Sequence, residues 1–169
     1  MSPNIILVGF MGAGKSVVAK NLAVRLKRDV VSTDALIEER EKRPITRIFK
    51  ESGEPYFRDI EKKIVAEVSQ RKDLIIDCGG GVVMNDENIK NLKKNGVLFY
   101  LSASADVIYD RVKNDKHRPL LNVADPIATI KGLLTNRQPR YAQAHHTVDT
   151  SHKTIPDVVE RIIKLYSHE

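Results

Sequence analysis

Short apolar runs and amphipathic helical patterns alternate along the chain. The apolar runs predict five strands, at residues 5–8, 30–31, 74–76, 97–101 and 147–149. Apolar residues spaced three or four apart predict helices at residues 17–26, 54–71, 86–95, 105–113, 127–144 and 155–167. Because helices separate the strands, the pattern predicts an α/β fold in which a parallel sheet is covered on both faces.

Two segments between these elements lack a strong apolar pattern. Residues 35–51 form a polar, helix-prone insert that Pro44 breaks, and residues 114–125 are predicted to form a loop or mobile flap. Gly96 directly follows a predicted helix and is expected to be its C-terminal stop. Since no linker or internal repeat interrupts the pattern, we predict a single domain over residues 1–169.

The stretch Gly9–Ser16, with the sequence GFMGAGKS, follows the first apolar run and precedes a helix. It fits the P-loop pattern, in which glycines let backbone N–H groups approach phosphate oxygens and the following helix N-terminus attracts the anion. Lys15 would reach the β- and γ-phosphates, and the Ser16 hydroxyl would bind Mg²⁺. The alternative is a glycine-rich turn that binds nothing. Motif and context together favour a nucleotide site, at Gly12, Ala13, Gly14, Lys15, Ser16 and Val17.

Composition narrows the class of ligand. The chain has 169 residues, 41% hydrophobic and 30% charged, which is ordinary for a globular protein, and a formal net charge of +6. No basic run is present and aromatic residues make up only 5%, so small anions are favoured over nucleic acid. The lone Cys78 excludes an internal disulfide. The first apolar run is too short for a signal peptide or membrane span, so a cytoplasmic location is expected.

Ligands of open parallel sheets collect at the carboxyl ends of the strands. Asp34 follows the second strand, where it would serve either as a helix N-cap or as a carboxylate that orients an attacking hydroxyl. Ser32 or Thr33 could also provide the N-cap. The simpler interpretation of Arg58 is a surface ion pair with Glu54 or Glu61, which would contribute little to stability.

Three consecutive glycines, Gly79, Gly80 and Gly81, follow the third strand. They cost backbone entropy, so close approach of a ligand to the main chain is a better explanation than a plain turn. Arg118 in the flap would either be solvated or close over the transferring phosphate.

Two further candidates cannot be resolved from composition. Arg137 and Arg140 would both lie on a helix surface in the simpler interpretation. His145 and His146 are adjacent and are expected to be surface residues, not metal ligands.

Together these residues give the chain a resemblance to shikimate kinases that runs nearly end to end. The matching pieces are Gly9–Ser16, Thr33-Asp34 with Ile37-Glu38, Gly53-Glu54 with Phe57-Arg58 and Glu61, Gly79–Gly81, Arg118–Leu121, Arg137 with Pro139 and Tyr141, and Val148–Thr150. The resemblance implies a three-layer α/β/α P-loop kinase fold with a five-stranded parallel sheet ordered 2-3-1-4-5, a lid at about 114–125 and a substrate-binding insert at about 34–61. It also implies ATP-dependent phosphorylation of the 3-hydroxyl of shikimate, in aromatic amino-acid biosynthesis.

The resemblance also assigns roles to single residues. Asp34 would hold the attacking hydroxyl, and Lys15 and Arg118 would act on the phosphates. Arg111 would lie against the adenine. Arg58, Arg137 and the Gly79–Gly81 backbone would hold the carboxylate and hydroxyls of shikimate, because a planar guanidinium pairs bidentately with a carboxylate.

The chain departs from the family pattern near the metal. Many shikimate kinases carry an aspartate two residues before the position of Asp34, but here Ser32 stands there. Asp77 could compensate as a carboxylate at the end of the third strand. Since side chains alternate along a strand, Asp77 and Cys78 cannot both face the metal, and the family's small hydroxyl residue at position 78 predicts that Cys78 is the inward one. We expect Mg²⁺ binding to be intact but weaker.

Two rival functions come from other classes. A gluconate-kinase-like enzyme would keep the P-loop but would have less use for the set of Arg58, the triple glycine and Arg137. A non-catalytic ligand sensor would carry a separate DNA-binding segment, for which no residues are left over. The sequence therefore favours a shikimate kinase with ATP and shikimate as ligands, no nucleic-acid or membrane partner, and a monomeric state.

Overall fold

The computed structural model describes residues 1–115 and 122–169. Its five strands are β1 (Asn4–Val8), β2 (Val30–Ser32), β3 (Ile75–Asp77), β4 (Gly96–Ser102) and β5 (His146–Asp149). The helices are α1 (Lys15–Leu26), α2 (Thr33–Glu41), α3 (Ile45–Val68), α4 (Asp86–Lys94), α5 (Ala105–Val112), α6 (Pro126–Tyr141) and α7 (Ile155–Tyr166), with a 3-10 turn η1 (Val82–Met84) after β3. All strand pairs are parallel and the order is β2-β3-β1-β4-β5, which confirms the predicted fold.

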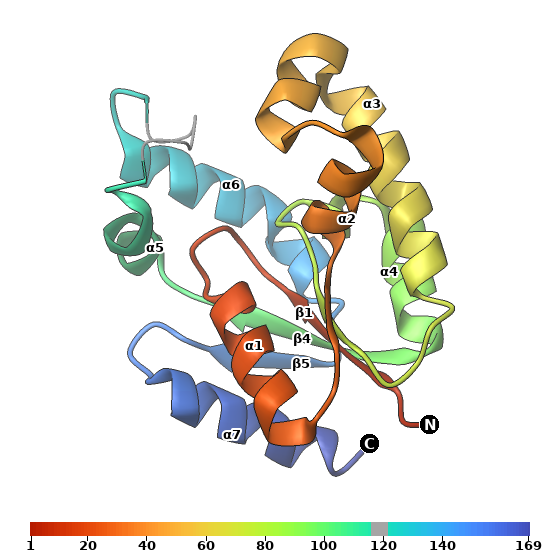
Figure 1. Ribbon diagram of the computed structural model, residues 1–169. Helices are drawn as coiled ribbons and strands as arrows, with labels where there is room; N and C mark the ends of the chain where they lie inside the picture. The colour runs from red at the N-terminus through yellow and green to blue at the C-terminus, as the bar shows by residue number, and fades with distance from the viewer. Residues whose placement is uncertain (116–121) are drawn as a thin grey trace.

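The central strand β1 shows why the sheet needs helices on both faces. All five of its residues are buried, and their side chains alternate between two cores. Ile5 and Leu7 pack with the residues of α1 and α7, whereas Ile6 and Val8 pack with those of α3 and α4. Figure 1 shows these two helix pairs on opposite sides of the sheet. In contrast, β2, which was predicted as a short strand at residues 30–31, is an edge strand whose three residues are exposed or half-buried.

The helix α3 combines two segments that the sequence predicted separately. Gly53 interrupts it with φ 83° and ψ 168°, a backbone conformation that favours glycine. Pro55 then lies in the first turn of the second half, where a missing N–H costs nothing. The break therefore separates a short helical arm, residues 45–52, from the long half that packs on the sheet.

Gly96 does not have the predicted role of a helix stop. The helix α4 ends at Lys94, and Gly96 is already the first residue of β4, paired with Asn4. A Cβ built on Gly96 would overlap the end of the Ile6 side chain. The glycine is therefore required by packing between adjacent strands.

Three remaining expectations concern the second half of the chain. His145 is exposed, and its Nδ1 accepts a hydrogen bond from the Leu98 N–H at 2.9 Å. His146 opens β5 and stacks on Phe99 at 5.2 Å between ring centroids, so it is half-buried and not the surface residue expected. Part of the predicted flap, including Arg118, lies outside the described residues. Within the described ranges, no helix combines the length and apolar content that a membrane crossing requires.

Candidate active site

The P-loop lies between the end of β1 and the start of α1. Gly12 and Gly14 have φ of 75° and 96°, which lets the loop curl back toward the helix N-terminus. The Lys15 ammonium donates to the carbonyls of Gly9 at 2.8 Å and Phe10 at 3.1 Å and so lies across the loop. Backbone N–H groups, a helix N-terminus and an ammonium group therefore converge on one anion site.

A cavity of about 370 Å³ opens beside the P-loop. It is lined by Met11, Gly12, Gly14, Lys15, Ser16, Val17, Ser32, Asp34, Asp77, Cys78, Gly79 and Gly80. These residues come from the P-loop and from the carboxyl ends of β2 and β3, so three of the segments that the strand-end rule brings together line one cavity.

The start of α2 aims Asp34 at the glycine turn, residues Gly79–Gly81. The N-cap is Ser32, whose Oγ accepts from the Ala35 N–H at 3.2 Å, so Asp34 does not cap the helix. Thr33 Oγ1 accepts from the Gly79 N–H at 3.0 Å, which ties α2 to the turn. A Cβ on Gly79 would lie 2.5 Å from Asp34 Oδ1, so only glycine lets the carboxylate come this close.

The electrostatic surroundings of Asp34 disfavour its ionised form. Burial raises its pKa most; Lys15 lowers it, and Asp77 raises it. A carboxylate in this position holds a proton more readily than an exposed aspartate, which suits a group that accepts a proton from a hydroxyl.

Arg58 makes both of the ion pairs that the sequence allowed, but they differ in burial. Its Nη1 donates to Glu61 Oε1 at 2.7 Å, and its Nε donates to Glu54 Oε1 at 3.3 Å. The Glu61 side chain is 1% exposed, so this pair is not the weak surface contact considered above. A Cβ on Gly81 would overlap the Arg58 guanidinium, which therefore lies directly against the turn.

Glu61 was considered from the sequence only as a surface partner of Arg58, and its buried position beside the site was not predicted. Its Oε2 is buried and, among the described residues, has no hydrogen-bond partner. Burial raises its pKa and Arg58 lowers it. The available signal was an acidic residue on the apolar face of α3, three positions after Arg58 and beside the buried Ile60 and Ile64.

The third residue at the glycine turn is Arg137, on α6. Its Nη1 donates to the Gly80 carbonyl at 3.4 Å, and its guanidinium lies over the Phe10 ring at 5.4 Å. Tyr141, one turn further along α6, donates to the same carbonyl at 2.7 Å. Arg140 instead pairs with Asp86 away from the cavity. The structure thus separates the two arginines that composition could not.

The glycine turn therefore has a more specific explanation than the one predicted. Side chains of the protein itself approach each of its three residues: Asp34 at Gly79, Arg137 and Tyr141 at Gly80, and Arg58 at Gly81. One carboxylate and two guanidinium groups thus converge on the glycine turn. Such a set recognises a small molecule that carries both a carboxylate and hydroxyl groups.

Arg111 ties the P-loop to the far edge of the sheet. It donates to the Gly12 carbonyl at 3.1 Å, to Thr150 Oγ1 at 3.1 Å and to the Thr150 carbonyl at 2.6 Å. These contacts leave its expected role against adenine untested.

The prediction that Cys78 faces the metal site was wrong. Asp77 Oδ2 accepts a hydrogen bond from the Ser16 hydroxyl at 2.6 Å. Cys78 is 1% exposed and packs in the core with Ile6 and Ile76, and burial raises the pKa of its thiol well above the usual value. Cys78 directly follows β3 and also lines the cavity, but the carboxylate of Asp77 is the group that contacts the P-loop serine, and this depends on how the neighbouring strands pack.

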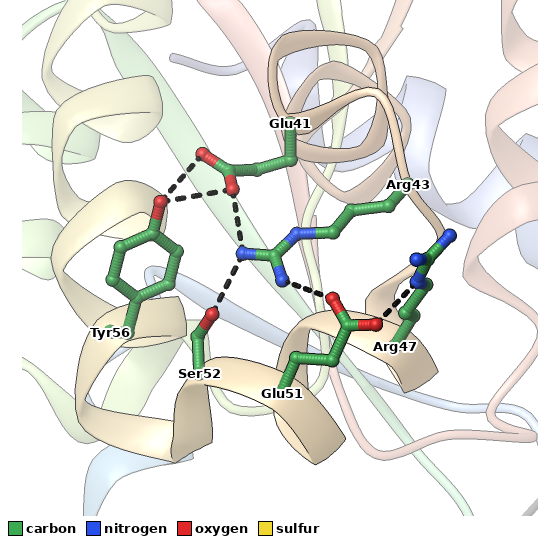
Figure 2. Close-up of polar contacts among 6 residues, drawn as sticks. All are labelled: Glu41, Arg43, Arg47, Glu51, Ser52 and Tyr56. Carbon is green, nitrogen blue, oxygen red and sulfur yellow. Dashed lines mark hydrogen bonds and ion pairs between the residues drawn. The ribbon is translucent and has the colours of Figure 1, made fainter.

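A polar network fixes the helical arm to the end of α2 (Figure 2). Arg43 is at its centre and donates to Glu41 at 3.1 Å, Glu51 at 2.8 Å and Ser52 at 2.8 Å. Its guanidinium also lies over the Tyr56 ring, 5.6 Å from the centroid. The network joins residues on both sides of the Gly53 break.

Comparisons with known proteins agree with this geometry. A shikimate kinase from Thermodesulfovibrio yellowstonii is 46% identical over 163 residues, covering 96% of this chain and 94% of that protein. One from Caldanaerobacter subterraneus subsp. tengcongensis is 44% identical, with coverage of 96% and 95%. The solved structure of a shikimate kinase from Acinetobacter baumannii in complex with shikimate matches with a TM-score of 0.93 at 36% identity, covering 99% of this chain and 94% of that one.

More distant likeness shows the fold alone. A gluconokinase from Sinorhizobium meliloti matches with a TM-score of 0.62 at 16% identity, covering 98% of this chain and 92% of that one.

The fold and the site define a class, the P-loop kinases that phosphorylate small molecules. A family model described as shikimate kinase matches residues 11–167, nearly the whole chain. The chain belongs to the shikimate kinase family.

Proposed function

We propose that this protein transfers the γ-phosphoryl group of ATP to the 3-hydroxyl of shikimate, giving shikimate 3-phosphate and ADP, in aromatic amino-acid biosynthesis. The observation that carries the proposal is the convergence of Asp34, Arg58 and Arg137 on the glycine turn beside a P-loop. The family of the chain supports the same reaction.

On the nucleotide side, Gly12, Ala13, Gly14 and Val17 would surround the phosphates with Lys15 and Ser16. The left-handed backbone at Gly12 and Gly14 supports this role, because it turns loop N–H groups toward an anion. Arg111 would flank the adenine, and Arg118 in the lid would meet the transferring phosphoryl group; Arg118 lies outside the described residues.

On the acceptor side, Arg58 and Arg137 would pair with the carboxylate of shikimate, and the backbone of Gly79–Gly81 would meet its hydroxyls. Because shikimate offers little apolar area, charge-assisted hydrogen bonds of about 1.5–3 kcal/mol each must supply most of the affinity. Glu61 would hold Arg58 in place from its buried position at 2.7 Å.

Asp34 would hold the 3-hydroxyl for attack and accept its proton. Its position against Gly79, on the cavity that Lys15 also lines, supports a hydroxyl placed between carboxylate and phosphate. Phosphoryl transfer needs positioning and charge neutralisation more than covalent chemistry. In the proposed reaction Asp34 and Lys15 would supply these two contributions.

Mg²⁺ is the proposed cofactor, with the Ser16 hydroxyl as a ligand. The described residues hold no group of three or more His, Cys, Asp or Glu that could bind a metal alone. This fits Mg²⁺, which binds through a few protein oxygens together with nucleotide phosphates and water. When bound, the ion neutralises charge that develops on the phosphates.

A coupled assay of ADP release separates this function from its rivals. Purified protein is given MgATP with shikimate, with gluconate, or with no acceptor. We expect turnover with shikimate only. Turnover with gluconate would indicate a different small-molecule kinase, and binding of shikimate without turnover would indicate a ligand sensor; either result contradicts the proposal.

The proposal includes the organisation of the whole molecule. We expect one domain over residues 1–169, with the acceptor insert at about 34–61 and the lid at about 114–125, acting as a cytoplasmic monomer. Light scattering on a size-exclusion column gives the mass of the particle, expected near the chain mass of 19.0 kDa. Cell fractionation with an antibody tests the location.

A further inference from the structure

Ser32 and Asp77 are register partners at the carboxyl ends of the neighbouring strands β2 and β3. Both line the cavity beside the P-loop. Asp77 carries a carboxylate, whereas Ser32 carries a hydroxyl that already accepts the capping hydrogen bond of α2. Of this pair, the position on β3 therefore supplies the negative charge.

Asp77 is directly connected to the P-loop. The Ser16 hydroxyl donates to Asp77 Oδ2 at 2.6 Å. Because a carboxylate only accepts hydrogen bonds, the hydroxyl must donate its proton to it, and the serine oxygen keeps its lone pairs for a cation. Ser16 lies in the first turn of α1 and Asp77 at the end of β3, so both are held by regular structure.

The charge balance of the cavity also points to a cation. Its lining contains four titratable side chains: Lys15, Asp34, Asp77 and Cys78. Two of these side chains, Asp34 and Asp77, are carboxylates, and one, Lys15, is an ammonium. Asp77 is only 8% exposed, and a buried carboxylate gains from a cation beside it.

We propose that Asp77, from β3, is the carboxylate that holds the Mg²⁺ of the bound nucleotide at Ser16, and that Ser32 brings no charge to this task. The proposal rests on the proposed function, because it concerns the metal of the same phosphoryl transfer. Oxygen donors from a carboxylate and a hydroxyl are the ligands that Mg²⁺ prefers. The carboxylate that supports the metal thus comes from β3 instead of β2, but it lies in the same cavity.

The test measures the coupling between Mg²⁺ and ADP binding, without any turnover. Isothermal titration calorimetry gives the Kd of ADP with and without Mg²⁺, and the ratio of the two is the coupling. In Asp77→Asn we expect this ratio to fall about 10–100-fold, the usual effect of removing a group that supports a metal site. Affinity for ADP without Mg²⁺ should stay within about threefold of wild type, since the phosphate contacts remain.

A matched control and an exchange variant make the result specific. Asp110→Asn removes an aspartate whose side chain is 69% exposed on α5 and should leave the coupling unchanged. Asp77→Ser should lose the coupling like Asp77→Asn. Adding Ser32→Asp to Asp77→Ser should recover at least about tenfold of it, because the register partner returns a carboxylate to the same cavity.

A spectroscopic readout identifies the site of the change. Electron paramagnetic resonance of Mn²⁺ in the ADP complex should show weaker Mn²⁺ binding in Asp77→Asn than in wild type and Asp110→Asn. Circular dichroism and thermal melting establish that each variant is folded; if Asp77→Asn does not fold, the comparison of Asp77→Ser with the exchange variant decides the question.

Wild-type coupling in folded Asp77→Asn or Asp77→Ser overturns the proposal, as does an exchange variant with no more coupling than Asp77→Ser. Because ADP and the metal are measured without acceptor, the result is independent of whether shikimate is the substrate.

Discussion

At the scale of single residues, the site is a set of buried charges that hold one another in place. Arg58 and Glu61 form a buried pair, and Asp34 lies between Lys15 and the glycine turn. Buried charges cost free energy of folding unless they are paired, so their presence together at one strand edge is a mark of function. Each can be tested through the quantity that it controls.

Asp34 should determine the acid side of the pH profile. Burial raises its pKa above the ordinary 3.8; Asp77 and Glu38 also raise it, while Lys15 and Arg58 lower it. Since the residue works in its ionised form, kcat/KM for shikimate should fall as the pH drops through this raised pKa. Asp34→Asn should lose turnover and retain ADP affinity. An acid limb at the ordinary aspartate pKa would contradict the assignment.

Asp34→Asn should lower turnover but raise the stability of the fold at pH 7–8. A carboxyl whose folded-state pKa is raised contributes stability below its unfolded pKa and loses it as the pH rises through the folded value. At pH 7–8 the ionised Asp34 therefore destabilises the fold. We expect Asp34→Asn to unfold at a higher urea concentration than wild type at this pH and to lose that advantage near pH 3. A lower midpoint at pH 7–8 would show that the charge is fully compensated.

Arg137 should act on the acceptor and not on the nucleotide. Arg137→Ala removes a guanidinium that contacts the Gly80 carbonyl at the glycine turn. We expect the Kd of shikimate to rise about 10–150-fold, which corresponds to one charge-assisted hydrogen bond of about 1.5–3 kcal/mol. The Kd of ATP should change little. Arg140→Ala, on the same helix but paired with Asp86, is the control and should change neither; equal losses for both ligands in Arg137→Ala would refute the assignment.

At the scale of elements, the acceptor side depends on the shape of α2 and α3. The Gly53 break divides α3, and the Arg43 network fastens the helical arm to α2 and to Tyr56 beyond the break (Figure 2). The two elements that carry Asp34 and Arg58 are therefore held in a fixed relation. Site geometry at this end comes from the contacts between elements, not from any one helix.

Arg43→Ala should loosen this relation. The Arg43 side chain is 17% exposed and bridges Glu41, Glu51 and Ser52, so its loss releases the helical arm. We expect KM for shikimate to rise several-fold, with KM for ATP and kcat nearly unchanged, as measured by steady-state kinetics. Arg47→Ala is the control, because its pair with Glu51 is a surface contact with a side chain 63% exposed. A parallel loss in kcat and both KM values would indicate general unfolding instead.

At the scale of the whole molecule, the sheet serves as a platform whose carboxyl edge collects the P-loop, Asp34 and the glycine turn (Figure 1). Arg137 reaches the same edge from α6, far along the chain. In the proposed function the nucleotide and acceptor contacts come from helices on both faces, so we expect ligands to stabilise the domain as one unit.

Thermal melting measures this stabilisation. MgADP at 100 times its Kd should contribute about 2.7 kcal/mol to the free energy of unfolding. For a domain of this size that raises Tm by about 5–11 °C. Shikimate should give a further, separate increase in wild type that is much smaller in Arg137→Ala. A rise with shikimate that is the same in both proteins would place its binding elsewhere.

Much of this architecture follows from local sequence. The strand runs, the helices that separate them and the glycine spacing of the P-loop each depend on neighbours within a few residues, and the carboxyl-end rule then gathers Lys15, Asp34 and the glycine turn. This reasoning left Arg58 and Arg137 as surface residues, and only the family resemblance assigned them to the acceptor, because the contacts that hold them at the glycine turn join separate elements.

Tertiary structure alone decided the rest. The sequence predicted that Asp77 and Cys78 face opposite ways, but both line the cavity, and the packing of β3 between β2 and β1 places Asp77 against Ser16. The sequence predicted that Gly96 ends a helix, but in the structure a side chain at this position would overlap Ile6 on the adjacent strand. The periodicity of helices and strands follows from local backbone geometry, so it can be predicted from the sequence. The direction in which a side chain points and its burial depend on contacts between residues far apart in the chain.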